Sequence, residues 1–257
     1  MRPSLLARTG LRGRRPARLQ IGMRSLALHG SGQAIASVDL EEPGLAPVCA
    51  AAGGLLGQHA ELPVQVRLAC GWSRILLLPW MAALAREDHW RNYATARFEE
   101  NFGEEAAAWE IRIARDLPGH ARVAVAWPRP LYETLGAHRG VVSARVGLLE
   151  HLGVLLAQAP RFSGCVIELD DDGAGFLLLV EGKLQRVRWR RYDGAQGLAS
   201  AVHAEWASVL AARDDPTGIE PALAVTPPAL VARSERGAAI KELGARLGVR
   251  EGYSLPD

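Results

Sequence analysis

The stretch that decides the fold is residues 165–192, "CVIELDDDGAGFLLLVEGKLQRVRWRRY". Its three apolar-rich segments, CVIELD, GFLLLVEG and LQRVRWRRY, are separated by turn-forming residues, so the stretch predicts a three-stranded antiparallel meander. The first connection contains Asp170, Asp171, Asp172 and Gly173. Asp and Gly tolerate the positive φ values that tight hairpin turns need, which favours a turn. A run of carboxylates beside glycine is also compatible with a phosphate or metal loop.

Known loop chemistry favours the turn. A calcium-binding EF-hand loop needs acidic residues at alternating positions and a later glutamate, whereas Asp170, Asp171 and Asp172 are adjacent. The sequence also has no GxxxxGK[ST] phosphate loop and no GxSxG nucleophile motif. Residues 29–32, "HGSG", lie between two alternating segments and are interpreted as another turn.

The two later strands of the meander differ in their patterns. Residues 176–180, "FLLLV", are apolar on both faces, which indicates a sheet covered by helices on both sides. Residues 186–191, "RVRWRR", alternate arginine with Val187 and Trp189. This alternation predicts a half-exposed strand whose arginines face solvent, with a basic contact patch as the alternative.

Upstream segments show similar strand patterns. "RSLALHG" and "QAIASVDL" flank Ser31 and Gly32 as the arms of a hairpin, and "PVQVRLA" and "SRILLLPW" flank residues 70–72 in a similar way. A helix follows, in which four residues recur at intervals of four: Trp90, Ala94, Phe98 and Phe102. This spacing predicts a buried aromatic stripe, with an exposed partner groove as the alternative.

The rest of the chain alternates strands and helices. "WEIRIA" and "RVAVAW" are predicted strands, "PRPLYETLGAHRG" is a predicted helix, and "VVSARVGLLEHLGVLLAQA" is a strand entering a helix. After the meander we predict a helix in "GAQGLASAVHAEWASVLAAR", a strand in "PALAVTP" and a last helix in "SERGAAIKELGARLG". Two passes of strands followed by helices indicate an internally duplicated α/β protein. We place the first α/β lobe at residues 23–160 and a second, shortened lobe at residues 161–257.

Residues 1–22 contain six arginines, no acidic residue and little apolar periodicity. They predict a disordered basic arm, and an upstream start codon in place of Met23 would account for them. A basic arm that touches a membrane or nucleic acid is the alternative.

Composition excludes several classes of protein. The chain has 257 residues, of which 49% are hydrophobic, which is enough for a sizeable core. A formal net charge of +2 does not indicate a nucleic-acid-binding protein. Three distant cysteines and seven scattered histidines, with no CxxC, HExxH or HxH spacing, argue against disulfide and metal sites. No apolar run is long enough to span a bilayer, so we expect a cytoplasmic protein.

The repeated strand, turn, strand, strand, helix pattern resembles the actin-like, ribonuclease-H-like ATPase fold. In that family each lobe opens with a hairpin whose glycine-containing turn binds nucleotide phosphates, and the second turn usually follows an apolar strand as Asp-x-Gly. "CVIELDDDGAGFLLLVEG" looks like that second opening, with Asp171 and Gly173 in the Asp-x-Gly positions. "LALHGSGQAIASV" looks like the first. The resemblance therefore implies that any nucleotide-contacting residues are Gly30, Ser31, Gly32, Asp171, Gly173 and Gly175.

Within this fold the chain is similar to pilus-assembly and type II secretion platform proteins of the PilM/GspL kind. Two segments carry the similarity: residues 122–152, "RVAVAWPRPLYETLGAHRGVVSARVGLLEHL", and "SRILLLPW" with the aromatic helix after it. The similarity implies a two-lobed α/β protein in the cytoplasm, with peripheral attachment to the inner membrane as an extension of that expectation. Its implied partners are an inner-membrane pilus or secretion platform protein, or the assembly ATPase, without specific nucleic acid.

The departures from the family pattern indicate a non-catalytic protein. His29 stands in the first turn where an active member usually has a metal-binding acid. Phosphoryl transfer depends on placed charges and Mg²⁺, so their loss should abolish hydrolysis. We therefore expect a scaffold or adaptor that has no catalytic residues, no metal site and no cofactor beyond residual ATP and Mg²⁺ binding. The alternatives are an active ATPase or sugar-kinase-like enzyme of the same superfamily and an unrelated α/β interaction module.

Overall fold

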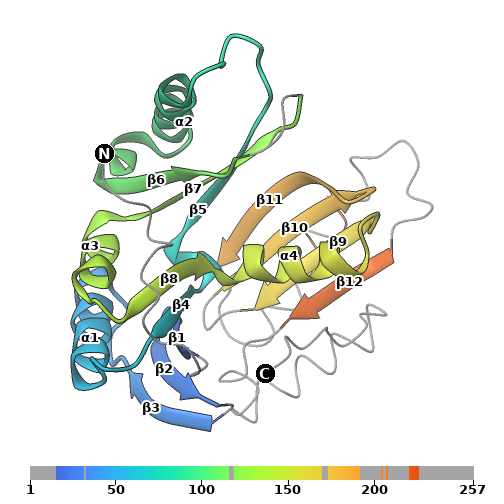
Figure 1. Cartoon of the computed structure of the whole chain (residues 1–257). Coiled ribbons are helices and arrows are strands. Elements are labelled where there is room, and N and C mark those ends of the chain that lie inside the picture. The colour runs from blue at the N-terminus through green and yellow to red at the C-terminus, as the bar shows by residue number, and fades with distance from the viewer. Residues whose placement is uncertain are drawn as a thin grey trace.

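A computed structural model describes residues 16–31, 33–115, 119–169, 173–191, 204, 207 and 220–225. Its strands form three sheets, two of which share one topology (Figure 1). Together with the helices that cover them, these sheets give the mixed α/β architecture that the sequence predicts. The predicted helices at residues 194–213 and 234–248 fall almost wholly outside the described residues.

The first sheet has five strands in the order β3-β2-β1-β4-β8. These strands are β1 (Ala17–Ile21), β2 (Ser25–Gly30), β3 (Gln33–Asp39), β4 (Val64–Leu68) and β8 (Val141–Val146). The first three strands form an antiparallel meander, and β4 and β8 are added parallel to β1. Two helices, α1 (Leu45–Gln58) and α3 (Arg129–Ala137), lie side by side against this sheet (Figure 1). The helix α1 buries residues spaced for one helical face: Val48, Ala52, Leu55 and Leu56.

The predicted arm at residues 1–22 is wrong for residues 17–21. These residues form β1, which pairs with β2 on one side and β4 on the other. The alternation in "ARLQI" turns Ala17, Leu19 and Ile21 into the core, where each is at most 4% exposed. The short strand escaped detection because only five residues carry its alternating pattern, next to an arginine-rich segment. The first lobe therefore begins before Met23.

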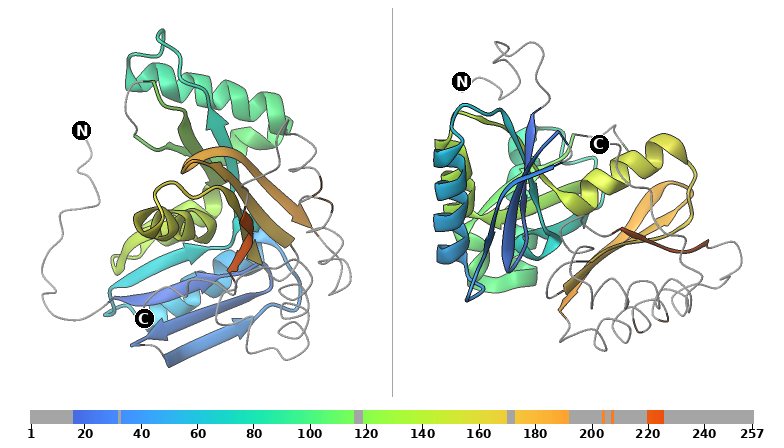
Figure 2. Two further views of the ribbon diagram at one scale, coloured as in Figure 1. Left: turned by 90° about the vertical axis from the view of Figure 1, so that its right-hand side faces the viewer. Right: turned by 90° about the horizontal axis from the view of Figure 1, so that it is seen from below.

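The second sheet has four strands in the order β11-β10-β9-β12. These are β9 (Gly164–Leu169), β10 (Gly173–Val180), β11 (Lys183–Arg191) and β12 (Glu220–Val225). β9, β10 and β11 are antiparallel neighbours, which confirms the predicted meander. The first seven residues of β10 are buried. The helix α4 (Gly147–Gln158) runs from the end of β8 across β9 and β10 and so links the two sheets (Figure 2).

The third sheet has three antiparallel strands in the order β5-β7-β6. They are β5 (Arg74–Leu78), β6 (Trp109–Ile113) and β7 (Arg122–Pro128). The hairpin predicted around residues 70–72 is wrong, because β4 and β5 belong to different sheets and the short 3-10 helix η1 (Cys70–Trp72) redirects the chain between them. A second 3-10 helix, η2 (Gly103–Ala108), leads into β6.

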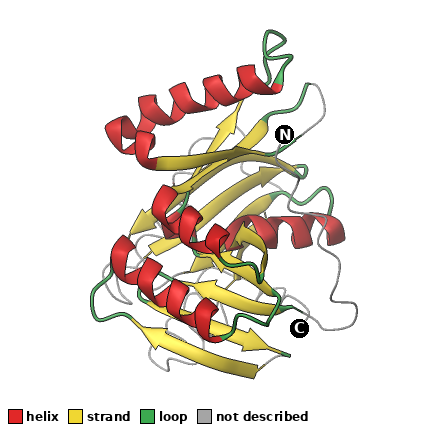
Figure 3. Ribbon diagram, turned by 60° about the vertical axis from the view of Figure 1, so that its left-hand side comes forward, coloured by secondary structure: helices red, strands yellow, loops and turns green. Residues whose placement is uncertain are grey.

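The helix α2 (Glu87–Phe102) covers the third sheet (Figure 3). Trp90, Ala94 and Phe98 are each at most 2% exposed, so these three positions of the predicted stripe form a core face. Phe102, the fourth position, is partly buried against the same core and also lines a groove. The Phe98 ring packs against Phe102 and Trp109 at centroid distances of 5.9 and 6.3 Å. None of the described helices is long and apolar enough to cross a membrane.

The first two sheets are structural duplicates of each other. In each sheet three strands form an antiparallel meander, and a fourth strand joins parallel to the first. The strands β1, β2, β3 and β4 therefore correspond to β9, β10, β11 and β12. The predicted lobe boundary at 160/161 falls between α4 and β9.

Candidate functional site

The duplication identifies which turn opens each lobe. The connection between β9 and β10 is residues 170–172, and its counterpart between β1 and β2 is residues 22–24, "GMR". In both hairpins the last paired residues are five positions apart along the chain, Ile21 with Leu26 and Leu169 with Ala174. The sequence interpretation placed the first turn at residues 29–32, one connection too late. The correct turn still has no acidic residue.

Gly30 and Ser31 lie at the β2–β3 turn, at the far end of β2 from residues 22–24. Ser31 adopts φ 51°, and its counterpart in the second lobe is Glu181 at φ 50°. A Cβ at Gly30 would meet Ile35 at 2.6 Å, so this glycine allows close packing within the hairpin. These residues are not brought together with the predicted residues of the second lobe. Gly32 and Asp171 lie outside the described residues.

Gly173 and Gly175 begin β10 and face the junction between the lobes. Neither has a positive φ, so the reason expected for Gly173, a left-handed turn conformation, is wrong. A Cβ at Gly173 would lie 2.6 Å from the indole ring of Trp189. A Cβ at Gly175 would lie 2.8 Å from Leu148 and 2.9 Å from Cys70 Sγ. Both glycines are needed because other side chains pack directly on the backbone.

Side chains from both lobes meet at this junction. At Gly71, a Cβ would lie 2.7 Å from Met23 Sδ and 3.4 Å from Trp189. Met23 belongs to the opening turn of the first lobe, and Trp189 is the residue that covers Gly173 in the second lobe. The indole Nε1 of Trp72 donates a hydrogen bond of 2.8 Å to the carbonyl of Gly22 in the same first-lobe turn. The first-lobe turn and the start of β10 are therefore connected by packed side chains.

A buried polar cluster lies beside this contact, and it was not identified from the sequence. Arg67 on β4 donates from Nη2 to Glu168 Oε1 on β9 at 2.9 Å, and the same nitrogen hydrogen-bonds Nε2 of His151 on α4. Arg67, His151 and Glu168 are at most 6% exposed. Glu150 Oε2 approaches Arg67 Nε at 4.0 Å. The cluster thus joins the first sheet, the linking helix and the second sheet.

Glycine at position 147 lets the cluster form. A Cβ there would lie 2.3 Å from Glu168 Oε1 and 2.5 Å from Arg67 Nε. Gly147 is the first residue of α4, and the next backbone N–H, that of Leu148, donates to the Glu168 carboxylate. A carboxylate at a helix N-terminus is also favoured by the helix dipole.

Burial controls the protonation of the cluster. The pKa of His151 is lowered to about 3, first by burial and then by the positive charge of Arg67. Burial raises the pKa of the Glu168 carboxyl, and the ion pair with Arg67 opposes that shift. His151 is therefore neutral, and its Nε2 can accept from Arg67. Glu168 Oε2 is buried and has no hydrogen-bond partner among the described residues.

The alternating pattern explains why the cluster was missed. Gln65 and Arg67 are the polar positions of "VQVRL", which is the pattern of a strand with one solvent-exposed face. Arg67 is nevertheless covered by His151 of α4, a contact between distant segments that sequence periodicity cannot show. His29, which the sequence analysis considered in the first turn, has an imidazole whose pKa is lowered by burial and then by the positive charge of Arg18. Within the described residues no cluster of three or more His, Cys, Asp or Glu side chains could hold a metal ion.

No family model matches the chain, and a comparison with curated proteins also gives no match. Solved structures do match. A Bacteroides thetaiotaomicron protein with an actin-like ATPase fold superposes with a TM-score of 0.59 at 10% identity, covering 91% of this chain and 88% of that one. A PilM–PilN type IV pilus biogenesis complex matches with a TM-score of 0.57 at 16% identity, covering 92% and 87%.

These matches extend over both lobes and fit the duplicated topology. The cytoplasmic domain of EpsL, an inner-membrane component of the Vibrio cholerae type II secretion system, matches with a TM-score of 0.49 at 15% identity over 82% of both chains. The two higher-scoring neighbours, together with the two equivalent hairpin-led sheets, show that this chain has the actin-like ATPase fold.

Proposed function

We propose that the protein is a non-catalytic scaffold or adaptor that uses the actin-like fold to assemble other proteins. The packed junction carries this proposal. Met23, Gly71 and Trp189 are in contact where the family would place phosphates between its two opening turns. A bound nucleotide would have to displace these side chains. The first turn, "GMR", also lacks the carboxylate that would hold Mg²⁺.

The buried arginine gives a second, independent argument. Arg67 supplies a fixed positive charge next to Glu168, three residues before Asp171, where the predicted Asp-x-Gly segment begins. In a phosphoryl-transfer site, carboxylates near the phosphates act through Mg²⁺. Here Oε1 of the carboxylate is paired with Arg67, a side chain of the protein itself.

A binding and hydrolysis measurement with Mg-ATP tests the proposal that the protein is non-catalytic. A ligand that binds only the folded state raises its stability by RT ln(1 + [L]/Kd), so a true nucleotide site would raise the melting temperature in a saturable way. We expect a change within about 1 °C at millimolar Mg-ATP and no phosphate release above a blank. Saturable stabilisation, with phosphate release that is lost in Asp171→Ala, would instead support the active-enzyme alternative.

The proposed setting is the cytoplasmic side of a type IV pilus or type II secretion-like assembly. The fold match to PilM in a PilM–PilN complex motivates this setting. Co-expression with the inner-membrane pilus or secretion protein, or the assembly ATPase, encoded nearby tests it. We expect one of these proteins to co-purify stoichiometrically. A genomic neighbourhood without pilin or secretion genes, combined with no co-purification, would contradict the setting.

A further inference from the structure

The loop between β5 and α2 carries an exposed apolar tip. Residues 79–85 read "PWMAALA" and contain no charged residue. Six of the seven are exposed, and Leu84 is partly buried. Trp80 and Met81 are 42% and 41% exposed, and they are the only adjacent pair among the large hydrophobic side chains exposed in the described part of the chain. Loop residues are usually polar or turn-forming, so an exposed apolar run of this length indicates a binding surface.

The backbone of this tip is held from both sides. Leu78, the last residue of β5, is 1% exposed, and Leu84 packs against the same core between α2 and the third sheet. The N–H of Leu84 donates a hydrogen bond of 3.0 Å to the carbonyl of Met81 and so closes a turn. Trp80 and Met81 lie between the two packed leucines, so a supported backbone presents them to solvent.

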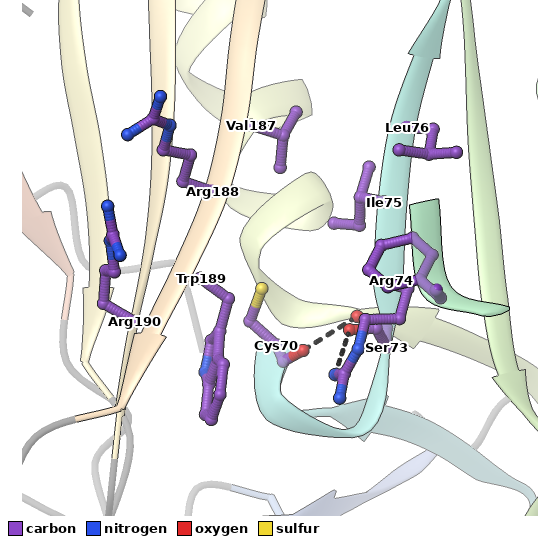
Figure 4. A pocket seen from close by; sticks show the side chains of 10 residues that line it. Cys70, Ser73, Arg74, Ile75, Leu76, Val187, Arg188, Trp189 and Arg190 are labelled. Atoms are coloured by element: carbon purple, nitrogen blue, oxygen red, sulfur yellow. Dashed lines mark hydrogen bonds between the residues drawn. The ribbon is translucent and has the colours of Figure 1, made fainter. Parts of the chain in front are cut away.

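The tip projects from the molecule. In all views of the whole chain the loop lies at an outer end, beyond the third sheet and the start of α2 (Figure 1, Figure 2, Figure 3). It contributes no residue to the groove of about 400 Å³ between β5 and β11, which is lined by Arg74, Ile75 and Leu76 at the start of β5 (Figure 4). A projecting apolar loop suits a fluid partner that closes around it, as a lipid bilayer does. A protein partner would need a cavity of matching shape.

The charges at the base of the tip are compatible with an anionic lipid surface. Arg86 pairs with Asp88 at 3.1 Å, and Arg115 pairs with Glu87 at 3.0 Å. Each of these carboxylates thus has a cation beside it, which offsets its repulsion of negatively charged headgroups. Arg91 is a further exposed cation on α2. Because exposed ion pairs are weak, the arginines can exchange a carboxylate for a lipid phosphate at little cost.

From these observations we propose that residues 79–85 form a membrane-docking loop, which inserts Trp80 and Met81 into the surface of an anionic lipid bilayer. Tryptophan is favoured at the boundary between headgroups and acyl chains, where its ring is buried and its N–H stays hydrated. The methionine adds apolar area beside it, and the small alanines of the loop let the backbone approach the surface. This docking is independent of the scaffold function, since it concerns where the protein is held and not what it assembles.

Flotation of the full chain with vesicles of phosphatidylethanolamine and phosphatidylglycerol tests the loop directly. We expect partitioning onto the vesicles that weakens about tenfold in Trp80→Ser/Met81→Ser, equivalent to about 1.4 kcal/mol. The matched control Ile35→Ser/Val142→Ser changes side chains that are 44% and 41% exposed on β3 and β8. It should partition within about twofold of the unaltered protein, because isolated exposed apolar residues are ordinary surface features. Both double variants remove two exposed hydrophobic side chains, so their position distinguishes them.

Fluorescence quenching supplies a readout of insertion that simple charge attraction would not give. Lipids brominated on their acyl chains should quench part of the tryptophan emission of the bound, unaltered protein. Trp80→Phe keeps an apolar ring, so it should still bind the vesicles but lose that part of the quenching. Binding should weaken but persist at high salt, because salt screens only the contribution of the arginines.

Several results would overturn the membrane-docking loop. These are absence of vesicle binding, equal partitioning of the unaltered protein and Trp80→Ser/Met81→Ser, equal loss in both double variants, and equal quenching in Trp80→Phe. Loss of a co-purifying protein in the loop variant, without any vesicle binding of the unaltered chain, would assign the tip to a protein interface instead. The Mg-ATP and co-purification experiments do not depend on vesicles, so the scaffold function can stand where the docking loop fails.

Discussion

Arg67, His151 and Glu168 come from three different elements, yet their side chains share one buried site. A buried ion pair gains little over apolar packing, but loss of one partner leaves the other charge buried without compensation. The contribution of each of these residues to stability therefore depends on the presence of its partners.

Arg67→Met should destabilise the protein by about 3–5 kcal/mol, because it leaves Glu168 in the core without its cation. Urea unfolding of the purified variants measures this loss. The double variant Arg67→Met/Glu168→Leu is the control and should recover much of the stability, because it removes both charges. A loss under about 1 kcal/mol in the single variant would show that the pair is not buried as described.

His151 should make stability depend on pH. Its folded-state pKa is about 3, below the ordinary value of 6.5, so between these limits the unfolded chain binds a proton that the folded chain does not. The free energy of unfolding therefore decreases as pH falls below 6.5. From about pH 7 to about pH 5 the histidine should account for about 2 kcal/mol of the decrease.

His151→Gln isolates this contribution, because glutamine can still accept from Arg67 but does not titrate. Its stability should fall less than that of the unaltered protein over the same pH interval. Glu168, whose pKa is raised, acts in the opposite direction above its ordinary pKa and is present in both chains. Identical pH profiles for the two proteins would show that His151 is accessible to protons in the folded state.

Among the elements, β1 is the central strand of the five-stranded sheet. It lies between β2 and β4, and its three inward side chains belong to the largest apolar core. Removing it would leave unpaired backbone groups on both neighbouring strands and a cavity in that core.

A chain that starts at Met23 should therefore not fold. Circular dichroism should show no cooperative melting transition for this truncation, and Leu19→Asp should be strongly destabilised for the same reason, because it places an unpaired charge in the core. Substitution of the exposed Gln33, at the first position of the outer strand β3, by Asp is the matched control and should change stability by less than about 0.5 kcal/mol. A cooperative, native-like transition for the Met23 chain would contradict the central position of β1.

In the whole molecule, the two lobes are in contact through residues that pack closely and leave almost no free space between them. Gly173→Ala would push the Trp189 ring toward Gly71 and Met23 of the other lobe, so it should destabilise the protein by about 1–3 kcal/mol. Gly54→Ala in α1 is the matched control: a Cβ there meets nothing within 4 Å, and alanine should stabilise the helix by about 0.5–1 kcal/mol. Chemical denaturation measures both effects. Equal effects in the two variants would show that Trp189 moves aside freely.

The sequence predicted the architecture well because most strands and helices carry strong local patterns. Short-range periodicity in the sequence was enough to predict the meander at 164–191, the hairpin of β2 and β3, and the stripe on α2. The tertiary arrangement of these elements was harder to predict from the sequence. The pairing of β1 with β4, the separation of β4 from β5, and the burial of Arg67 under α4 each depend on segments far apart in the chain. The opening turn of the first lobe was consequently placed at residues 29–32, whereas the hairpin of β1 and β2 places it at residues 22–24.

The order of the strands in the chain has a consequence for synthesis on the ribosome. Every strand of the five-stranded sheet precedes residue 147, so that sheet can be completed before β9 is made. Arg67 is then in place, but its counter-charge on Glu168 has not yet emerged. Until β9 is made, Arg67 can approach Glu150 of α4 but lacks its closer ion pair with Glu168, so the first lobe gains this stabilisation only after the second lobe is translated. When the second lobe is translated, it thus supplies the carboxylate of Glu168, which pairs with Arg67 of the first lobe.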